Sequence, residues 1–144
     1  FMEYYALHSE DKTAAYDGIP ELLSSAREKG MKLGVITNKA HNIAQQVVPH
    51  FLGDGVFDYI RGLDDRIKAK PCPDGALDVA EKLGVQPSEV LYIGDSGVDM
   101  QTAVNAGFTP CGVLWGFRTE KELCDNGAKY IAHKPSDILD ITEK

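Results

Sequence analysis

The stretch that decides the fold is Val90-Leu91-Tyr92-Ile93-Gly94-Asp95-Ser96-Gly97-Val98-Asp99. Its first four residues are apolar and predict a buried strand, and Gly94 allows the backbone to turn sharply where that strand ends. Asp95 and Asp99 then follow, four positions apart, at the sheet edge where open α/β proteins bind their ligands. Because hard cations prefer carboxylate oxygen, this acid pair predicts a magnesium site. The simpler alternative is a turn and a helix cap, with Ser96 as a further capping residue.

Bulk properties fit one compact domain of a soluble globular protein. The chain has 144 residues, of which 43% are hydrophobic and 26% are charged. The net charge of −7 and the lack of a basic block argue against a nucleic-acid partner. The sequence holds neither a run of eighteen apolar residues nor a signal-peptide pattern, so we expect no membrane association and a cytoplasmic location. Three widely spaced cysteines predict reduced thiols.

Apolar strand-like runs alternate with amphipathic helical stretches along most of the chain. This alternation predicts an α/β fold with a mainly parallel sheet and helices on both faces. The expected strands are residues 32–37, 56–60, 90–93, 111–115 and 129–132, and the expected helices are residues 19–29, 40–50, 75–83, 98–106 and 120–126. The first sixteen residues do not follow this rhythm. Their apolar positions Phe1, Tyr4, Tyr5 and Leu7 predict a helix.

Thr37 and Asn38 form the first of two loops that are suited to phosphate. They follow an expected strand at the start of the next helix. At such a place a hydroxyl and backbone N–H groups can donate to phosphate oxygens. The alternative is that one of the two side chains only caps the helix.

Lys70 belongs to the second loop, in which Pro71 and Pro73 fix the backbone at a helix entrance. A lysine held in this way is a fixed point charge for a phosphate. The alternative is an ordinary solvated lysine, with Asp74 as the cap of the following helix. The four histidines have no mutual ligand spacing and predict surface or packing roles.

Taken in this order, the three loops resemble the haloacid dehalogenase superfamily of phosphohydrolases, and most closely its phosphoglycolate-phosphatase-like members. Val35-Ile36-Thr37-Asn38-Lys39 matches the second motif of the family, Lys70-Pro71 the third, and Gly94–Asp99 the fourth. The resemblance implies a Rossmann-like core domain over residues 17–144. It also implies that residues 1–16 are the end of a helical cap domain and its hinge.

The resemblance implies a magnesium-dependent phosphomonoester hydrolase acting on a small phosphorylated metabolite. In such enzymes an aspartate attacks phosphorus, and water then hydrolyses the aspartyl-phosphate. By resemblance, Thr37 and the Asn38 backbone N–H hold the phosphoryl group, and Lys70 stabilises its charge. Asp95 ligates Mg²⁺, and Asp99 ligates it directly or through water and orients its neighbours. Arg118 would lie in a loop that approaches the substrate.

The first motif of the family, an Asp-x-Asp-Gly that supplies the nucleophile, has no match in this chain. By resemblance we expect the C-terminal part of a longer phosphatase, with an incomplete core that lacks the central strand and most of the cap and is inactive alone. The strands at 32–37 and 90–93 would then face a gap, which is an aggregation hazard. A strand swapped from another copy, rearranged pairing of the chain's own strands, or a bound N-terminal fragment would fill that gap.

Other readings of the same residues stay open. One is a non-catalytic module that binds phosphate or a partner without turnover. A phosphoryl mutase or a dehalogenase of the same superfamily is another, although Thr37 and Lys70 favour phosphate over halide chemistry. The substrate is not determined by these residues, because selectivity in such enzymes depends largely on the cap.

Overall fold

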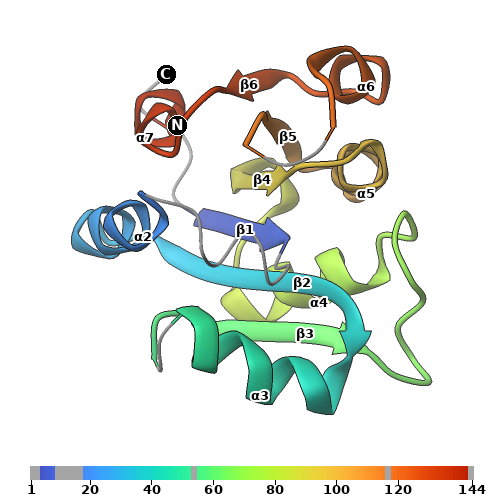
Figure 1. The fold of residues 1–144 in the computed structure, drawn as a ribbon. Coiled ribbons are helices and arrows are strands. Elements are labelled where there is room, and N and C mark those ends of the chain that lie inside the picture. The colour runs from blue at the N-terminus through green and yellow to red at the C-terminus, as the bar shows by residue number, and fades with distance from the viewer. Residues whose placement is uncertain (1–3, 9–17, 53–54, 116–117, 143–144) are drawn as a thin grey trace.

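One six-stranded parallel sheet forms the centre of the molecule (Figure 1). A computed structural model describes residues 4–8, 18–52, 55–115 and 118–142. The strands are β1 (Tyr4–His8), β2 (Lys32–Ala40), β3 (Tyr59–Leu63), β4 (Val90–Gly94), β5 (Thr109–Val113) and β6 (Tyr130–Ala132). Their order is β3-β2-β1-β4-β5-β6, and each neighbouring pair is parallel. The α/β fold predicted from the alternation is confirmed.

Helices cover both faces of this sheet and bury two apolar clusters. They are α2 (Ile19–Glu28), α3 (His41–Leu52), α4 (Asp74–Leu83), α5 (Gly97–Ala106), α6 (Glu120–Asp125) and α7 (Ser136–Thr142), with a short 3₁₀ turn at Pro87–Glu89. Side chains of α2, α3 and α7 pack in one cluster, and those of α4 and α5 in the other. In Figure 1, α2 and α7 accordingly lie on the opposite side of the sheet from α5 and α6. Since β4 is covered on both faces, all five of its residues are buried, which explains its continuous apolar run.

The central strand β1 corrects the expectation of a helix near the start of the chain. Its backbone pairs with β2 from Tyr4 to His8 and with β4 from Tyr4 to Leu7. The predicted helix is wrong for these residues, because periodicity in a short apolar and aromatic run does not separate helix from strand. The expected gap between β2 and β4 is filled by the chain's own segment. The domain boundary expected at residues 16 and 17 lies outside the described residues.

The strand β3 begins three residues later than expected. The apolar run at 56–60 predicts the strand there, but β3 is Tyr59–Leu63 and includes Arg61. Asp58, just before it, is bound to the start of β2, since its carboxylate accepts from the Leu33 N–H at 2.8 Å. A prediction of buried strands from apolar runs leaves out an arginine, but an arginine is stable in a buried strand where acidic side chains pair with it. The remaining strands and helices differ from the expected ranges only at their ends.

The strand order indicates at which edge of the sheet a ligand would bind. In the order 3-2-1-4-5-6 the direction of chain progression reverses between β1 and β4. Ligands of open α/β sheets bind outside the carboxyl ends of the strands at such a reversal. The end of β2 and the turn after β4 lie at this edge, so the topology brings the predicted phosphate and metal residues to one place.

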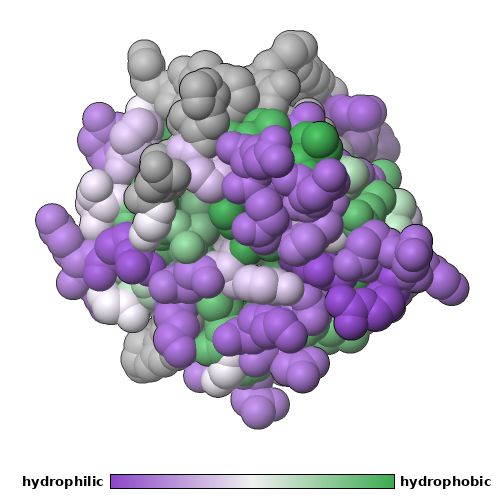
Figure 2. Space-filling model, turned by 90° about the horizontal axis from the view of Figure 1, so that it is seen from below, coloured by the Kyte–Doolittle hydropathy of each residue, from purple (hydrophilic) through white to green (hydrophobic). Residues whose placement is uncertain are grey.

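The outer surface is largely polar where Figure 2 displays it. On this face hydrophilic side chains predominate, and hydrophobic residues form small separate groups. Four large apolar residues of the described part are exposed, namely Ile43, Leu77, Val98 and Val104. Among the helices of the described residues, none has both the length and the apolar character that a membrane span requires.

The three cysteines are free and differ in reactivity according to their burial. Cys111 in β5 is buried, and burial, with a smaller effect from Asp137, raises the pKa of its thiol to about 12. Because the thiolate is the reactive form, we expect iodoacetamide at about pH 8 to alkylate the exposed Cys124 and to leave Cys111 unmodified. Mass spectrometry of the native and the urea-unfolded chain checks this. Equal labelling of both residues in the native chain would contradict it.

Candidate phosphate and metal site

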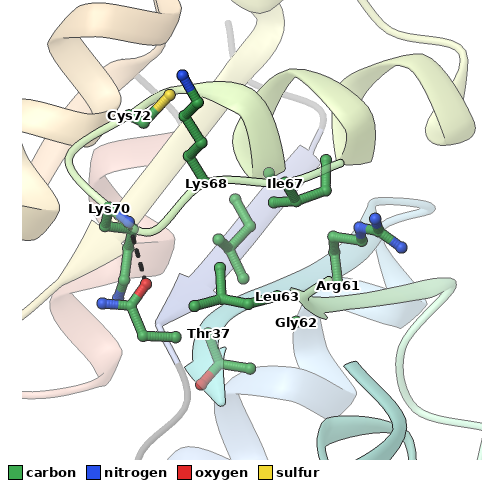
Figure 3. Close-up of a pocket in the computed structure, with 11 residues that line it drawn as sticks. Thr37, Arg61, Gly62, Leu63, Ile67, Lys68, Lys70 and Cys72 are labelled. Atoms are coloured by element: carbon green, nitrogen blue, oxygen red, sulfur yellow. Dashed lines mark hydrogen bonds between the residues drawn. The ribbon is translucent and has the colours of Figure 1, made fainter. Parts of the chain in front are cut away.

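Lys70 joins the three loops that the sequence singled out. Its backbone N–H donates to Asn38 Oδ1 at 3.0 Å (Figure 3). Its side chain donates from Nζ to Asp99 Oδ1 at 2.8 Å. The end of β2, the lysine loop and the start of α5 are therefore connected directly. Thr37 lies in the last part of β2 and Asp95 directly follows β4, so all five predicted site residues belong to one edge of the sheet.

The lysine loop is held from both sides by side-chain amides. Asn38 binds it from β2, and Asn105 Nδ2 of α5 donates to the Pro71 carbonyl at 2.9 Å. The Lys70–Pro71 peptide bond is cis. Asp74 does not cap α4 as expected, because Pro73 is at the N-cap position and the Asp74 carboxylate accepts from the Lys68 N–H instead. The position of Lys70 is thus set by contacts to two other elements rather than by its own helix.

Thr37 is buried and belongs to β2 rather than to a helix cap. The strand continues to Ala40 and has an irregular register between Ile36 and Ala40. Within this bulge Thr37 Oγ1 accepts a hydrogen bond from the Lys39 N–H at 3.2 Å. Neither Thr37 nor Asn38 caps α3, so the simpler alternative for these two residues is not found. Their role in holding a phosphoryl group stays a prediction.

Asp99 is fully buried, and its carboxylate accepts hydrogen bonds from four donors. Oδ1 accepts from Lys70 Nζ at 2.8 Å and from the Tyr92 hydroxyl at 3.3 Å. Oδ2 accepts from the Asp95 N–H at 3.3 Å and from Ser96 Oγ at 3.0 Å. A carboxylate has about four lone-pair sites, so these donors occupy its acceptor capacity. Asp99 is therefore well placed to hold Lys70, and its role as a ligand of Mg²⁺ stays a prediction.

The ion pair between Lys70 and Asp99 lies in the protein interior. The exposed fractions of the two side chains are 4% and 0%. Buried charges require a partner and further hydrogen bonds, and Tyr92 supplies one of these. Burial, followed by the negative charge of Asp99, raises the pKa of Tyr92 well above its ordinary value. Tyr92 is consequently a neutral hydrogen-bond donor to Asp99 at any working pH.

Gly94 is required for space rather than for turning the chain. It does not have a positive φ angle, although six other glycines do. A Cβ atom at Gly94 would lie 2.4 Å from Asp99 Cβ, closer than real Cβ atoms come to another heavy atom. The expectation that Gly94 supplies a sharp turn is thus replaced by another reason. Asp99 packs directly on the end of β4.

Asp95 follows β4 and precedes the first turn of α5. Ser96 is the N-cap of that helix, as the sequence suggested, because its Oγ accepts from the Asp99 N–H at 3.2 Å. Mg²⁺ sites use one or two carboxylates and are completed by water and substrate phosphate. Within the described residues no group of three or more His, Cys, Asp or Glu is placed to hold a metal. The donor set at Asp95 fits a magnesium ion shared with a phosphate, and does not fit an all-protein cage.

Arg61 is the main residue at this edge that the sequence did not single out. It lines the same pocket as Thr37 and Lys70, but its guanidinium points away from both (Figure 3). Its side chain is 6% exposed and pairs with Asp64 at 2.8 Å and with Asp78 at 3.4 Å. The sequence contains a sign of its importance, since Arg61 is a charged residue within the apolar run of β3. The pairing of Arg61 with Asp78 was not recognisable, because Asp78 is on another element, α4.

Two groups around Arg61, Tyr59 and Asp64, have shifted pKa values. The Tyr59 hydroxyl donates to Asp78 at 2.8 Å, and burial together with this carboxylate raises the pKa of Tyr59. The pKa of Asp64 is lowered, first by a hydrogen bond from the Arg66 N–H and then by Arg61. Asp64 also forms an isolated bridge with Ile67. This cluster therefore fixes the start of the loop that leads to Lys70.

The remaining candidates have structural contacts. His41 has a packing role, as expected, since its Nδ1 accepts from the Gly62 N–H at 3.1 Å. Lys68 lines the pocket but points away from Thr37 (Figure 3). Arg118 is exposed, and its Nη1 lies 3.5 Å from Glu122 Oε1. Its approach to a substrate stays a prediction.

The fold defines a class of protein, namely Rossmann-like α/β proteins, and the predicted phosphate and metal residues lie at the switch point of its sheet. The chain belongs to the haloacid dehalogenase-like hydrolase family, whose model matches residues 1–113. The family expected from the three loops is thereby confirmed.

Relatives of known description agree with this assignment. The chain is 31% identical over 146 residues to an N-acetylmuramic acid 6-phosphate phosphatase of Pseudomonas aeruginosa, covering 100% of this chain and 64% of that protein. It is 32% identical over 139 residues to a phosphoglycolate phosphatase of Escherichia coli, covering 96% and 55%. A solved haloacid dehalogenase-like family protein of Streptococcus pneumoniae superposes with a TM-score of 0.80 at 26% identity, covering 88% and 59%. The chain thus spans less than two thirds of the length of these proteins.

Proposed function

We propose that this chain is the larger part of the core of a phosphomonoester hydrolase that requires magnesium and acts on a small phosphorylated metabolite. The observation that carries the proposal is the buried ion pair between Lys70 and Asp99, at 2.8 Å. A fixed cation at the carboxyl edge of a Rossmann-like sheet suits the charge that develops on a transferring phosphoryl group. The names of the relatives support a phosphorylated metabolite as the substrate class.

The proposal gives each residue a role. Thr37 and the Asn38 backbone N–H donate to the phosphoryl oxygens, and Lys70 stabilises charge on the same group. Asp95 would hold Mg²⁺, which screens the repulsion between the phosphate and the attacking carboxylate. Asp99 holds Lys70 in place through the ion pair at 2.8 Å, and would ligate the metal directly or through water. The nucleophilic aspartate of an Asp-x-Asp-Gly motif is not among the residues of this chain.

The decisive experiment compares the full-length protein with the 144-residue chain on a panel of phosphomonoesters. We expect the full-length protein to release phosphate from a compound such as phosphoglycolate or N-acetylmuramic acid 6-phosphate when Mg²⁺ is present. Removing the metal with EDTA should lower the rate by at least about 100-fold, and Mg²⁺ should restore it, because metal stabilisation of phosphoryl charge is worth several kcal/mol. The 144-residue chain should be inactive.

Other outcomes would overturn parts of the proposal. Hydrolysis that is insensitive to EDTA would exclude the metal role of Asp95. Activity of the 144-residue chain alone would show that the nucleophile lies within it. Binding of a phosphate analogue by the full-length protein without any turnover would favour the non-catalytic module.

A further inference from the structure

The first turn of α5 is bound by a side chain from a different helix. The Gly97 N–H donates to Glu122 Oε2 of α6 at 2.8 Å. Gly97 is the first residue of α5, two positions after Asp95, so its N–H belongs to the group of donors that a helix leaves without an internal partner. Such donors at a helix start attract anions, including phosphate. Here a carboxylate of the protein itself occupies one of them.

Glu122 makes this contact in place of one within its own helix. Thr119 and Glu122 have the spacing of a capping box, in which the glutamate side chain returns to the N-cap backbone. One half of that motif is present, since Thr119 Oγ1 accepts from the Glu122 N–H at 3.1 Å. The glutamate carboxylate instead reaches Gly97 through Oε2 and Arg118 through Oε1. The Glu122 carboxylate therefore links α6 and Arg118 to the first residue of α5.

Close packing of α6 on Gly97 reinforces the contact. A Cβ atom at Gly97 would lie 2.5 Å from Asn126 Nδ2 and 3.3 Å from Glu122 Oε2. Asn126 in turn donates to the Glu122 carbonyl at 2.8 Å and accepts from Gln101 of α5. The end of α6 thus rests against the first turns of α5. Two observations place the Glu122 carboxylate against Gly97: the hydrogen bond from the Gly97 N–H, and the lack of space for a side chain at position 97.

We infer that Glu122 is a positioning residue that sets the backbone conformation from Asp95 to Gly97 and thereby the affinity of the site for a divalent cation. The inference rests on the proposed function, because it assumes that Asp95 ligates the metal. Glu122 acts on Asp95 only through the Gly97 peptide. It also removes the Gly97 N–H from the donors available to a phosphate, which leaves phosphate binding to Thr37, Asn38 and Lys70.

Two conservative variants separate position from charge. Glu122→Gln retains the length and an acceptor oxygen for the Gly97 N–H but loses the negative charge. Glu122→Asp retains the charge but is one methylene too short. If position matters, Glu122→Gln binds the cation almost as the native protein does. Glu122→Asp and Glu122→Ala then bind it about 10-fold more weakly, which is the lower end of the effect of residues that orient metal ligands. Glu120→Ala, which removes an exposed side chain in the same helix turn, is the control.

The experiment measures Mn²⁺ binding to the full-length protein by calorimetry, and hydrogen exchange of the Gly97 amide without metal. We expect Gly97 to exchange faster in Glu122→Asp and Glu122→Ala, and at the native rate in Glu122→Gln. Native cation affinity in both Glu122→Asp and Glu122→Ala would overturn the inference and leave the proposed function intact. Weak cation binding by Glu122→Gln together with native cation binding by Glu122→Asp would also overturn it, in favour of a charge effect. Absence of cation binding in the native protein would overturn both.

Discussion

Replacing Lys70 with methionine is expected to lower kcat/KM of the full-length protein by about 1,000-fold and also to destabilise its fold. The activity falls because the variant loses a preorganised cation at the phosphoryl group, and one such group is worth about 100- to 1,000-fold. The larger figure applies because Lys70 is 4% exposed, so that water does not take over its role. The fold is weakened because Asp99 is left as a buried charge without its lysine, at a cost of about 3–5 kcal/mol.

A second substitution separates these two effects. In Lys70→Met/Asp99→Asn the buried negative charge is removed as well. We therefore expect this double variant to regain more than half of the free energy of unfolding that Lys70→Met loses, as measured by urea denaturation. Hydrolysis should stay as low as in the single variant, because the cation is still absent. Lys134→Met, at an exposed lysine between β6 and α7, is the matched control and should change neither quantity. Recovery of activity in the double variant, or native activity in the single one, would contradict the role of Lys70.

Replacing Arg61 with alanine is expected to lower the free energy of unfolding by about 3 kcal/mol. Removing one member of a buried ion pair costs about 3–5 kcal/mol. The low end applies because the side chains of Asp64 and Asp78 are 33% and 21% exposed to solvent. The loss includes the packing of the aliphatic part of the arginine. Urea unfolding of the variant and the native chain gives the difference.

The control for the Arg61→Ala variant is Arg66→Ala. Arg66 is 85% exposed and lies 4.0 Å from the same Asp64 oxygen, so its removal should change stability by less than about 0.5 kcal/mol. A similar loss in both variants would show that net charge, rather than the buried pair, determines stability. Arg61→Ala should also reduce phosphatase activity, since Asp64 starts the loop that leads to Lys70.

Much of the fold follows from local pattern in the sequence. The continuous apolar run at β4 predicts a strand covered on both faces, and the alternation of strands and helices predicts parallel pairing. From parallel pairing it follows that the loops after β2 and β4 share one edge, and the structure connects them through Lys70. The N-cap at Ser96 was also recognisable, because capping depends only on the next three residues.

The contacts that determine the behaviour of the site were not recognisable. The segment Tyr4–His8 has the composition of either a helix or a strand, and its place between β2 and β4 depends on pairing with residues about 28 or more positions away. Gly94 was identified as necessary, but the reason is the approach of Asp99 rather than a turn. Arg61 is stable in a buried strand because Asp64 pairs with it and because Asp78, from α4, lies beside it.

The sequence by itself determined the parallel α/β architecture, the family, and the group of residues at the carboxyl edge of the sheet. Periodicity and loop chemistry are local properties, so they can be recognised without knowing what a residue touches. Only the tertiary structure decided the partners, namely that Asp99 holds Lys70 from 29 residues away and that Glu122 holds Gly97 from 25 residues away. The pair of Glu122 and Gly97 forms because α5 and α6 pack together. The pair of Lys70 and Asp99 forms because the lysine loop lies against α5, and no local pattern records either contact.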